Sequence, residues 1–180
     1  TIMKILISIF TSILFLWSCQ SENKADSHDH SRYSANQIVS DTSKGSPKRT
    51  VMANIGKTHI HIEYNSPAVR NRIIWGGLVP LGEVWVTGAH NATSISFSDN
   101  VKIEGKIIEK GKYAFFTIPN KEEWALILNK NWEQHLTDDY SEKDDILRWK
   151  VKPDSTEYME RLMYDIISKG EKGTVEMRWE

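Results

Sequence analysis

Alternating hydrophobic and polar residues predict β-strands along most of the chain after Arg49. The segment "THIHIEY" shows the pattern most clearly: Ile60, Ile62 and Tyr64 fall on one face, and His59, His61 and Glu63 fall on the other. A period of two is typical of a half-buried strand. The preceding residues, Asn54 to Lys57, predict a hairpin turn.

The same period continues further along the chain. "TSISF" and "NVKIEGKIIEKGKY" alternate, with turns at Glu104-Gly105 and Lys110-Gly111. "YAFFTIP" and "WALILN" carry apolar residues on both faces of the expected strand. This pattern predicts central strands that are covered on both sides. "ILRWKVK" and "TVEMRW" alternate again and predict two more strands.

One segment, Tyr158 to Ile167, fits two patterns. Tyr158, Leu162 and Ile166 would share one face of a helix, but strict alternation fits about as well. We favour a strand because strands are predicted on both sides and Gly170 and Gly173 follow.

Many short strands separated by turns predict an all-β fold, an antiparallel β-sandwich that is jelly-roll-like or a partly open barrel. The predicted domain spans residues 49–180, about 130 residues, which is long enough for one hydrophobic core. The sequence stops at Glu180, one residue past an inward tryptophan, and we expect an edge strand to be missing there.

The N-terminal region has the composition of an export signal. One cation, Lys4, precedes the apolar run "ILISIFTSILFLW", and Met3 is the expected start. Leu16-Trp17-Ser18-Cys19 resembles the bacterial lipobox, so we predict a signal peptide over residues 1–18 and lipidation of Cys19. The alternative is an ordinary secreted protein with an incidental thiol. The polar residues 19–48 predict a lipidated cysteine followed by a disordered tether, and the expected location is the cell envelope, on the periplasmic face or the cell surface.

Charge excludes one class of partner. The full chain has 23 basic and 24 acidic residues, a net charge of −1. Removal of residues 1–18 takes away Lys4 alone among them, which leaves 22 against 24, or −2. A balance so close to zero gives no general attraction to nucleic acid, so we expect contact with a membrane through the lipid anchor and none with nucleic acid.

The turn-rich stretch "GGLVPLGEVWVTGAHNATSISF" and Trp75 just before it hold the candidate binding residues. Aromatic rings beside short hydrogen-bonding side chains suit a glycan or a peptide. The predicted set is Trp75, Trp85, Thr87, His90, Asn91 and Thr93. The alternative is structural: the threonines and Asn91 satisfy loop backbone groups and Trp85 fills the core.

Other chemistry has weaker signals. His59 and His61 lie about 7 Å apart on one strand face, a spacing from which two imidazoles can converge on a metal, with His90 or His135 as a third ligand. A solvated polar face explains the same residues, so we predict no metal and no cofactor. No catalytic motif for nucleophiles, phosphate or dinucleotides occurs, although two carboxylates from distant strands would leave no signature.

From about Thr50 to Trp179 the chain resembles a bacterial envelope family, domain of unknown function 2911. The matching residues are Gly-Gly-Leu-Val-Pro from Gly76, Trp85, Thr87-Gly88-Ala89, Thr93, Gly111-Lys112-Tyr113 and the Phe-Thr-Ile-Pro turn. The resemblance implies an exported, largely β protein without an assigned activity. The family commonly has basic residues where this chain has Ser66 and Val86, and an asparagine where it has His90.

Together these features predict a lipid-anchored binding module rather than an enzyme. Its ligand would be a glycan, a peptide or an envelope protein. Two alternatives stay open: a hydrolase acting on envelope or extracellular polymers, and a purely structural component of an envelope complex.

Overall fold

The structure, a computed structural model, describes residues 2–7 and 45–180. The described elements are strands and one short 3-10 helix, η1. Their bounds are β1 Ile2–Ile7, β2 Lys48–Ile55, β3 Thr58–Asn65, β4 Thr93–Phe97, β5 Val101–Ile103, β6 Lys106–Ile108, β7 Gly111–Ile118, β8 Trp124–Asn129, η1 Glu142–Asp144, β9 Asp145–Val151, β10 Met163–Lys169 and β11 Lys172–Arg178.

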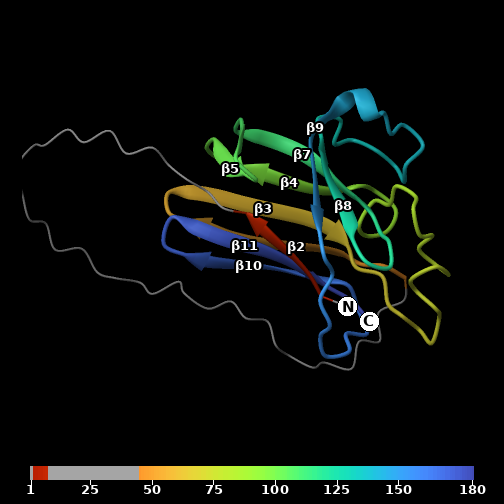
Figure 1. The fold of residues 1–180 in the computed structure, drawn as a ribbon. Coiled ribbons are helices and arrows are strands. Elements are labelled where there is room, and N and C mark those ends of the chain that lie inside the picture. Colours follow the sequence, from red (N-terminus) through yellow and green to blue (C-terminus); the bar gives the residue numbers. More distant parts are fainter. Residues whose placement is uncertain (1, 8–44) are drawn as a thin grey trace, which may run out of the picture.

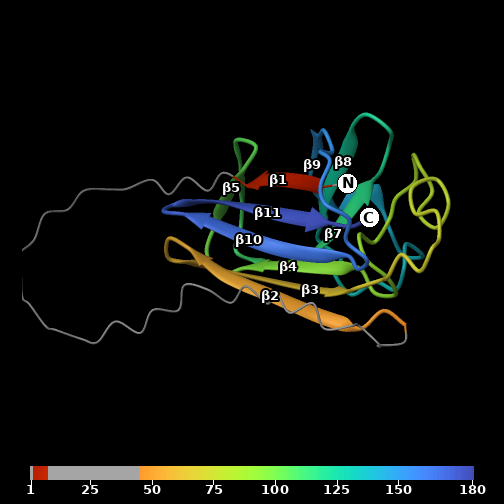
Figure 2. The same ribbon diagram turned by 90° about the horizontal axis from the view of Figure 1, so that it is seen from below.

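The strands form two packed antiparallel sheets. The larger has the order β2-β3-β4-β7-β8-β9 and the smaller has the order β1-β11-β10, while β5 and β6 make a separate hairpin. Figures 1 and 2 show the β10–β11 hairpin lying across the larger sheet next to β2 and β3. The sheets do not close into a barrel. The predicted all-β antiparallel sandwich is therefore confirmed.

The main core fills the space between the two sheets. It takes alternate residues of several strands, including Ile60 and Ile62 of β3, Leu126 of β8, and Val175 and Met177 of β11. An apolar gap inside it, lined by residues such as Ile95 and Trp149, has a volume of about 10 Å³. Since this is about the room needed by a single water molecule, this part of the core is closely packed.

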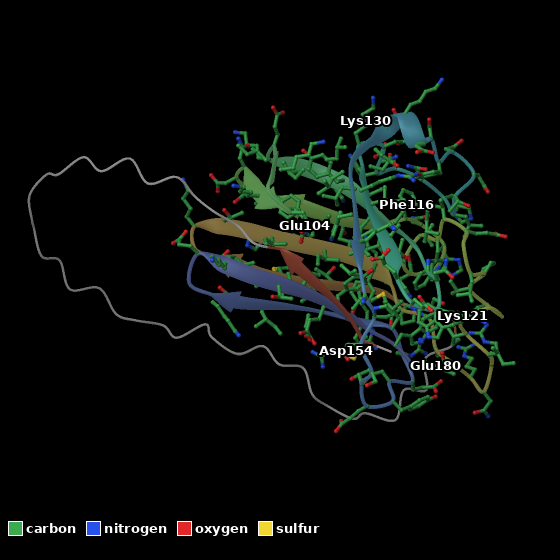
Figure 3. All side chains as sticks on the ribbon, viewed as in Figure 1. Glu104, Phe116, Lys121, Lys130, Asp154 and Glu180 are labelled. Carbon is green, nitrogen blue, oxygen red and sulfur yellow. The ribbon has the colours of Figure 1, made fainter. Side chains whose placement is uncertain are left out.

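A second apolar cluster covers the outer face of β7 and β8. Its members are Val86, Ala92, Ala114, Phe116 and Ile127, with Val84, Trp85, Ile118 and Tyr140 packed against it. Phe116 is labelled in Figure 3 at the loop-rich end of the molecule. Adjacent residues thus face different cores: Phe115 points between the sheets and Phe116 points outward. The prediction that these two strands are covered on both sides is confirmed.

The predicted turns also agree with the structure. Glu104 and Gly105 join β5 to β6 with φ of 47° and 84°, the backbone of a two-residue hairpin turn. In the ambiguous segment, β10 runs from Met163, so the preference for a strand is confirmed for its second half. Tyr158 precedes the strand and is exposed.

The first described residues form β1, which pairs with β11 along its full length. The predicted export signal, residues 1–18, therefore overlaps an edge strand of the smaller sheet. Cys19 and the predicted tether up to residue 44 lie outside the described residues. No helix in the described part of the chain is long and apolar enough to cross a membrane.

The second cluster makes a measurable contribution to stability. Phe116 is fully buried, so Phe116→Ala should lower the free energy of unfolding by about 3–5 kcal/mol through lost burial and a residual cavity. Chemical denaturation of both proteins measures the difference. Met52→Ala is the control, because Met52 is 56% exposed and its truncation should cost about 0.5 kcal/mol or less. Equal losses for the two variants would contradict a packed outer cluster.

Candidate functional site

Trp75 and Trp85, two of the predicted binding residues, lie in a cluster of four tryptophans. The ring of Trp75 meets those of Trp124 and Trp179 edge-on at 4.7 and 5.7 Å, and Trp85 stacks on Trp179 at 5.9 Å. The indole N–H of Trp85 donates to the carbonyl of Gly88 at 3.1 Å. Both rings are partly buried against the main core, an arrangement that favours packing over ligand contact.

Thr87 and Thr93 belong to a buried hydrogen-bond network. The carbonyl of Thr87 accepts bonds from the hydroxyls of Thr93 at 3.0 Å and Tyr164 at 2.8 Å. The Thr87 hydroxyl lies 3.1 Å from that of Thr117. Burial raises the pKa of Tyr164 well above its usual value, so its hydroxyl stays protonated and donates. The network joins the loop after Trp85 to β4, β7 and β10, and both threonines are inaccessible.

The glycine-rich motif around these residues has a steric explanation. A Cβ at Gly88 would lie 2.9 Å from the Thr93 hydroxyl and 3.1 Å from the carbonyl of Asn65. A Cβ at Gly77 would lie 2.4 Å from the carbonyl of Ile73. Only glycine allows these backbone approaches without displacement. Within the turn-rich stretch, residues 76–78 and 81–82 form turns.

The accessible candidate site is a cavity on the outer face of the larger sheet, with a volume of about 460 Å³. Its floor comes from β2, β3, β4 and β7, and its wall comes from the loop after β8. The lining residues are Lys48, Glu63, Tyr64, Asn65, Asn91, Ala92, Ser94, Lys112, Trp132, Glu133, Gln134 and His135. The volume falls in the range of about 300–1,000 Å³ typical of small-molecule sites.

Glu63 is the electrostatic centre of the floor. Its carboxylate oxygens contact the ammonium of Lys48 at 2.8 Å and that of Lys112 at 2.5 Å. Hydrogen bonds from Lys112 and then Lys48 lower its pKa to about 2. The Lys112 ammonium also lies 4.2 Å from the centre of the Trp132 ring, a cation–π contact. Glu63 is therefore ionised at every physiological pH.

The loop wall is fixed by pairing with the segment before β4. The backbone N–H of Ala92 donates to Gln134, and that of Leu136 donates to His90, at 2.9 and 2.7 Å. The side chains of Asn91 and His135 approach each other at 3.3 Å. Of the predicted binding residues, Asn91 lines the cavity, and His90 lies exposed beside it with φ of 61°.

Further along, the loop is tied to β9. Tyr140 packs on Phe116 with ring centroids 5.1 Å apart, and its hydroxyl donates to Asp145 at 2.8 Å. Burial and this bond raise the pKa of Tyr140 to about 12. Arg148 donates to the same Asp145 at 2.6 Å, so both ends of the loop have fixed contacts.

The metal alternative gains no support from the geometry. His59 is exposed and its Nδ1 lies 2.9 Å from the Asn54 side chain. His61 lies on the same outer strand face and is partly buried. Among residues 2–7 and 45–180, no group of three or more histidine, cysteine or acidic side chains is arranged to hold a metal ion.

Sequence reasoning missed much of the cavity. The sequence places Glu63 on the polar face of its strand, but it does not reveal the partners Lys48 and Lys112. Both lysines lie on other strands, Lys112 being 49 residues away in sequence, and no motif connects them to Glu63. Trp132 did carry a signal. It is a lone aromatic in the polar segment "NKNWEQ", where a buried role is hard to satisfy, and it is 38% exposed.

The fold and cavity define an antiparallel β-sandwich domain with a polar surface site. The chain belongs to the family described as "Protein of unknown function (DUF2911)", whose sequence profile matches residues 46–180. The resemblance inferred from the sequence is thereby confirmed. No curated protein and no solved structure matches the chain.

Ser66 and Val86, the two positions where the resemblance implied a basic residue, lie in buried surroundings. Ser66 donates its hydroxyl to the carbonyl of Leu162 at 2.8 Å, and Val86 packs in the outer cluster. Neither side chain lines the cavity, and both are buried.

The two tryptophan environments should respond differently to truncation. Trp85→Ala removes ring contacts and an indole hydrogen bond, and should lower the free energy of unfolding by about 3 kcal/mol or more. Trp132→Ala removes an exposed ring and one cation–π contact, and should cost about 1 kcal/mol or less. Urea unfolding of both variants beside the parent protein checks this order, and the reverse order would contradict the assignment of scaffold and cavity.

The ion pairs of Glu63 should make stability depend on pH. The folded pKa of about 2 lies below the ordinary value of 4.5, so the contribution is complete above about pH 4.5 and is lost as pH falls toward 2. The melting temperatures of the parent protein and Glu63→Gln should differ at pH 6 and converge at pH 2. A difference that stays constant across this range would show that the ion pairs add nothing.

Proposed function

We propose that this protein is an exported, lipid-anchored module that binds a short saccharide in the cavity beside Trp132. One observation carries the proposal: an exposed indole stands at the rim of a polar cavity of about 460 Å³. Sugars present both C–H surfaces, which pack against aromatic rings, and hydroxyls, which need several convergent donors and acceptors.

The hydrogen-bonding groups around the cavity suit that ligand class. Amides are supplied by Asn65, Asn91 and Gln134, a hydroxyl by Ser94 and an imidazole by His135. Amide side chains both donate and accept, as hydroxyl groups do. Lys112 stands over one face of the Trp132 ring, so a ligand would pack on the remaining exposed surface of the indole.

Charge favours a neutral ligand. The lining has two lysines, Lys48 and Lys112, and two glutamates, Glu63 and Glu133. Both lysines already contact Glu63. An anionic ligand would have to compete with that carboxylate, and a cationic ligand would meet the lysines, whereas a neutral saccharide meets neither cost.

The hydrolase alternative is less well supported. Glycoside hydrolysis by a carboxylate pair requires one carboxyl that holds a proton near the working pH. Glu63, with a pKa of about 2, would not supply it. The purely structural alternative has no feature of its own in the described residues, while the cavity favours binding.

The anchor part of the proposal rests on the sequence. The apolar run, the small residue before Cys19 and the polar segment after it support export, lipidation and attachment to the cell envelope. The folded domain would then lie at the membrane surface, in reach of envelope or extracellular polysaccharide.

Binding can be tested by isothermal titration calorimetry with two neutral probes, cellotetraose and an N-acetylglucosamine tetramer. We expect one of them to bind, Trp132→Ala to weaken it at least tenfold, and Asn91→Ala to weaken it about fivefold through one lost hydrogen bond. Ile107→Ser is the control, because Ile107 is exposed on β6 and does not line the cavity.

Unchanged affinity in Trp132→Ala would overturn the site. Binding of a neutral tetrapeptide in place of both sugars would keep the site and overturn the ligand class. Failure of all three probes to bind would overturn the proposed binding of neutral oligomers.

A further inference from the structure

The free edge of β11 in the smaller sheet is occupied by β1, whose apolar residues alternate around one lysine. β1 pairs with it antiparallel over six residues, from Ile2 opposite Arg178 to Ile7 opposite Gly173. Figure 2 shows the two strands side by side, and both the N- and C-terminal ends lie near one another. This pairing is separate from the saccharide cavity on the other sheet.

The register sorts the six positions by chemistry. Residues directly opposite in an antiparallel pair lie on the same face. Met3, Ile5 and Ile7 are opposite Met177, Val175 and Gly173, on the face of β11 that is buried in the main core. Lys4 is opposite Glu176. The edge thus matches a strand with alternate apolar residues and one cation.

The position has structural consequences beyond the pair. β1 also approaches β5 and β9, so it lies between the edge of the smaller sheet and the elements that flank the larger one (Figure 1). A strand at this position pairs with the backbone groups of β11 and extends the smaller sheet by one strand. Exposed sheet edges of this kind accept strands from other chains.

Residues 2–7 have two roles that exclude each other in one molecule. If the proposed export signal is removed before Cys19, these residues leave the protein, whereas as β1 they remain in the sheet. We propose that the β11 edge is a strand-acceptor site, filled by Met3–Ile7 in the precursor and available in the exported form to an extended segment of a partner protein. That segment carries apolar side chains at alternate positions and a basic residue opposite Glu176.

A second copy of β11 is a poorer occupant. Antiparallel self-pairing centred on Val175 keeps the core-facing residues on one face but places Lys172 opposite Arg178. Like charges directly opposite are destabilising. The site becomes available after export only if the proposed signal is removed. The ability of the β11 edge to bind a strand does not depend on that removal.

The test uses the full chain with the strand emptied by Ile5→Asp and Ile7→Asp, which place charge opposite Val175 and Gly173 of β11. Fluorescence anisotropy then measures binding of a labelled peptide, IMKILI with a Ser-Gly-Ser tail. The emptied variant should bind it at least tenfold more tightly than the parent chain, in which the tethered strand competes. The matched peptide IMEILI should bind about fivefold more weakly, because it places an acid opposite Glu176.

A charge swap isolates the site. In the emptied chain, Glu176→Lys should reverse the preference between the two peptides, and hydrogen exchange of β11 amides should slow when the preferred peptide is added. Equal binding to parent and emptied chains, no dependence on peptide charge, or exchange unaffected by peptide would each overturn the proposal. Titration of the emptied chain with a saccharide tests the cavity separately. Loss of saccharide binding would count against the cavity proposal and not against the strand-acceptor site.

Discussion

The need to cover β7 and β8 on both faces determines where this domain can have a site. These strands carry apolar side chains in both directions, with Phe115 in the main core and Phe116 outside it. The smaller sheet covers one side. The other side requires the loops before β4 and after β8 to lie across the sheet, because exposed apolar area of that size is unfavourable. Where this cover ends and the polar face of β3 begins, the surface is hollowed into the cavity.

The cover is held by buried polar bonds as well as by packing. The carbonyl of Thr87 accepts two hydroxyl bonds, from Thr93 and from Tyr164 of the smaller sheet. Loss of either donor would leave a buried carbonyl less satisfied. Since Thr87 has φ of 52°, an unusual conformation for a β-branched residue, these bonds compensate local strain. The network thus couples the two sheets to the loop that forms one side of the cavity.

Most strands and turns of the fold could be predicted from local sequence patterns, because the strand period and the turn-forming residues are properties of neighbouring positions. "THIHIEY" and the Glu104-Gly105 turn could be placed from sequence, and so could the two-sided strands. The site could not be placed in the same way. Trp85 and Trp132 are both tryptophans near polar residues, and only tertiary packing puts one in a ring cluster and the other at a cavity rim. Lys112 and Glu63 meet across β4, a contact with no local signature.

The cavity is preorganised, and its two sides achieve this differently. Glu63, Ser94 and Lys112 stand on paired strands, where backbone register fixes their spacing. Trp132 and His135 stand on a loop, but that loop is bonded to His90 and Ala92 at one end and reaches Asp145 through Tyr140 at the other. A ligand therefore orders few groups on binding, and less of the interaction energy is lost to entropy. Weak individual contacts, such as those of neutral hydroxyl groups, can then give useful affinity, which supports the proposal of a neutral saccharide over a ligand that depends on a single strong charge.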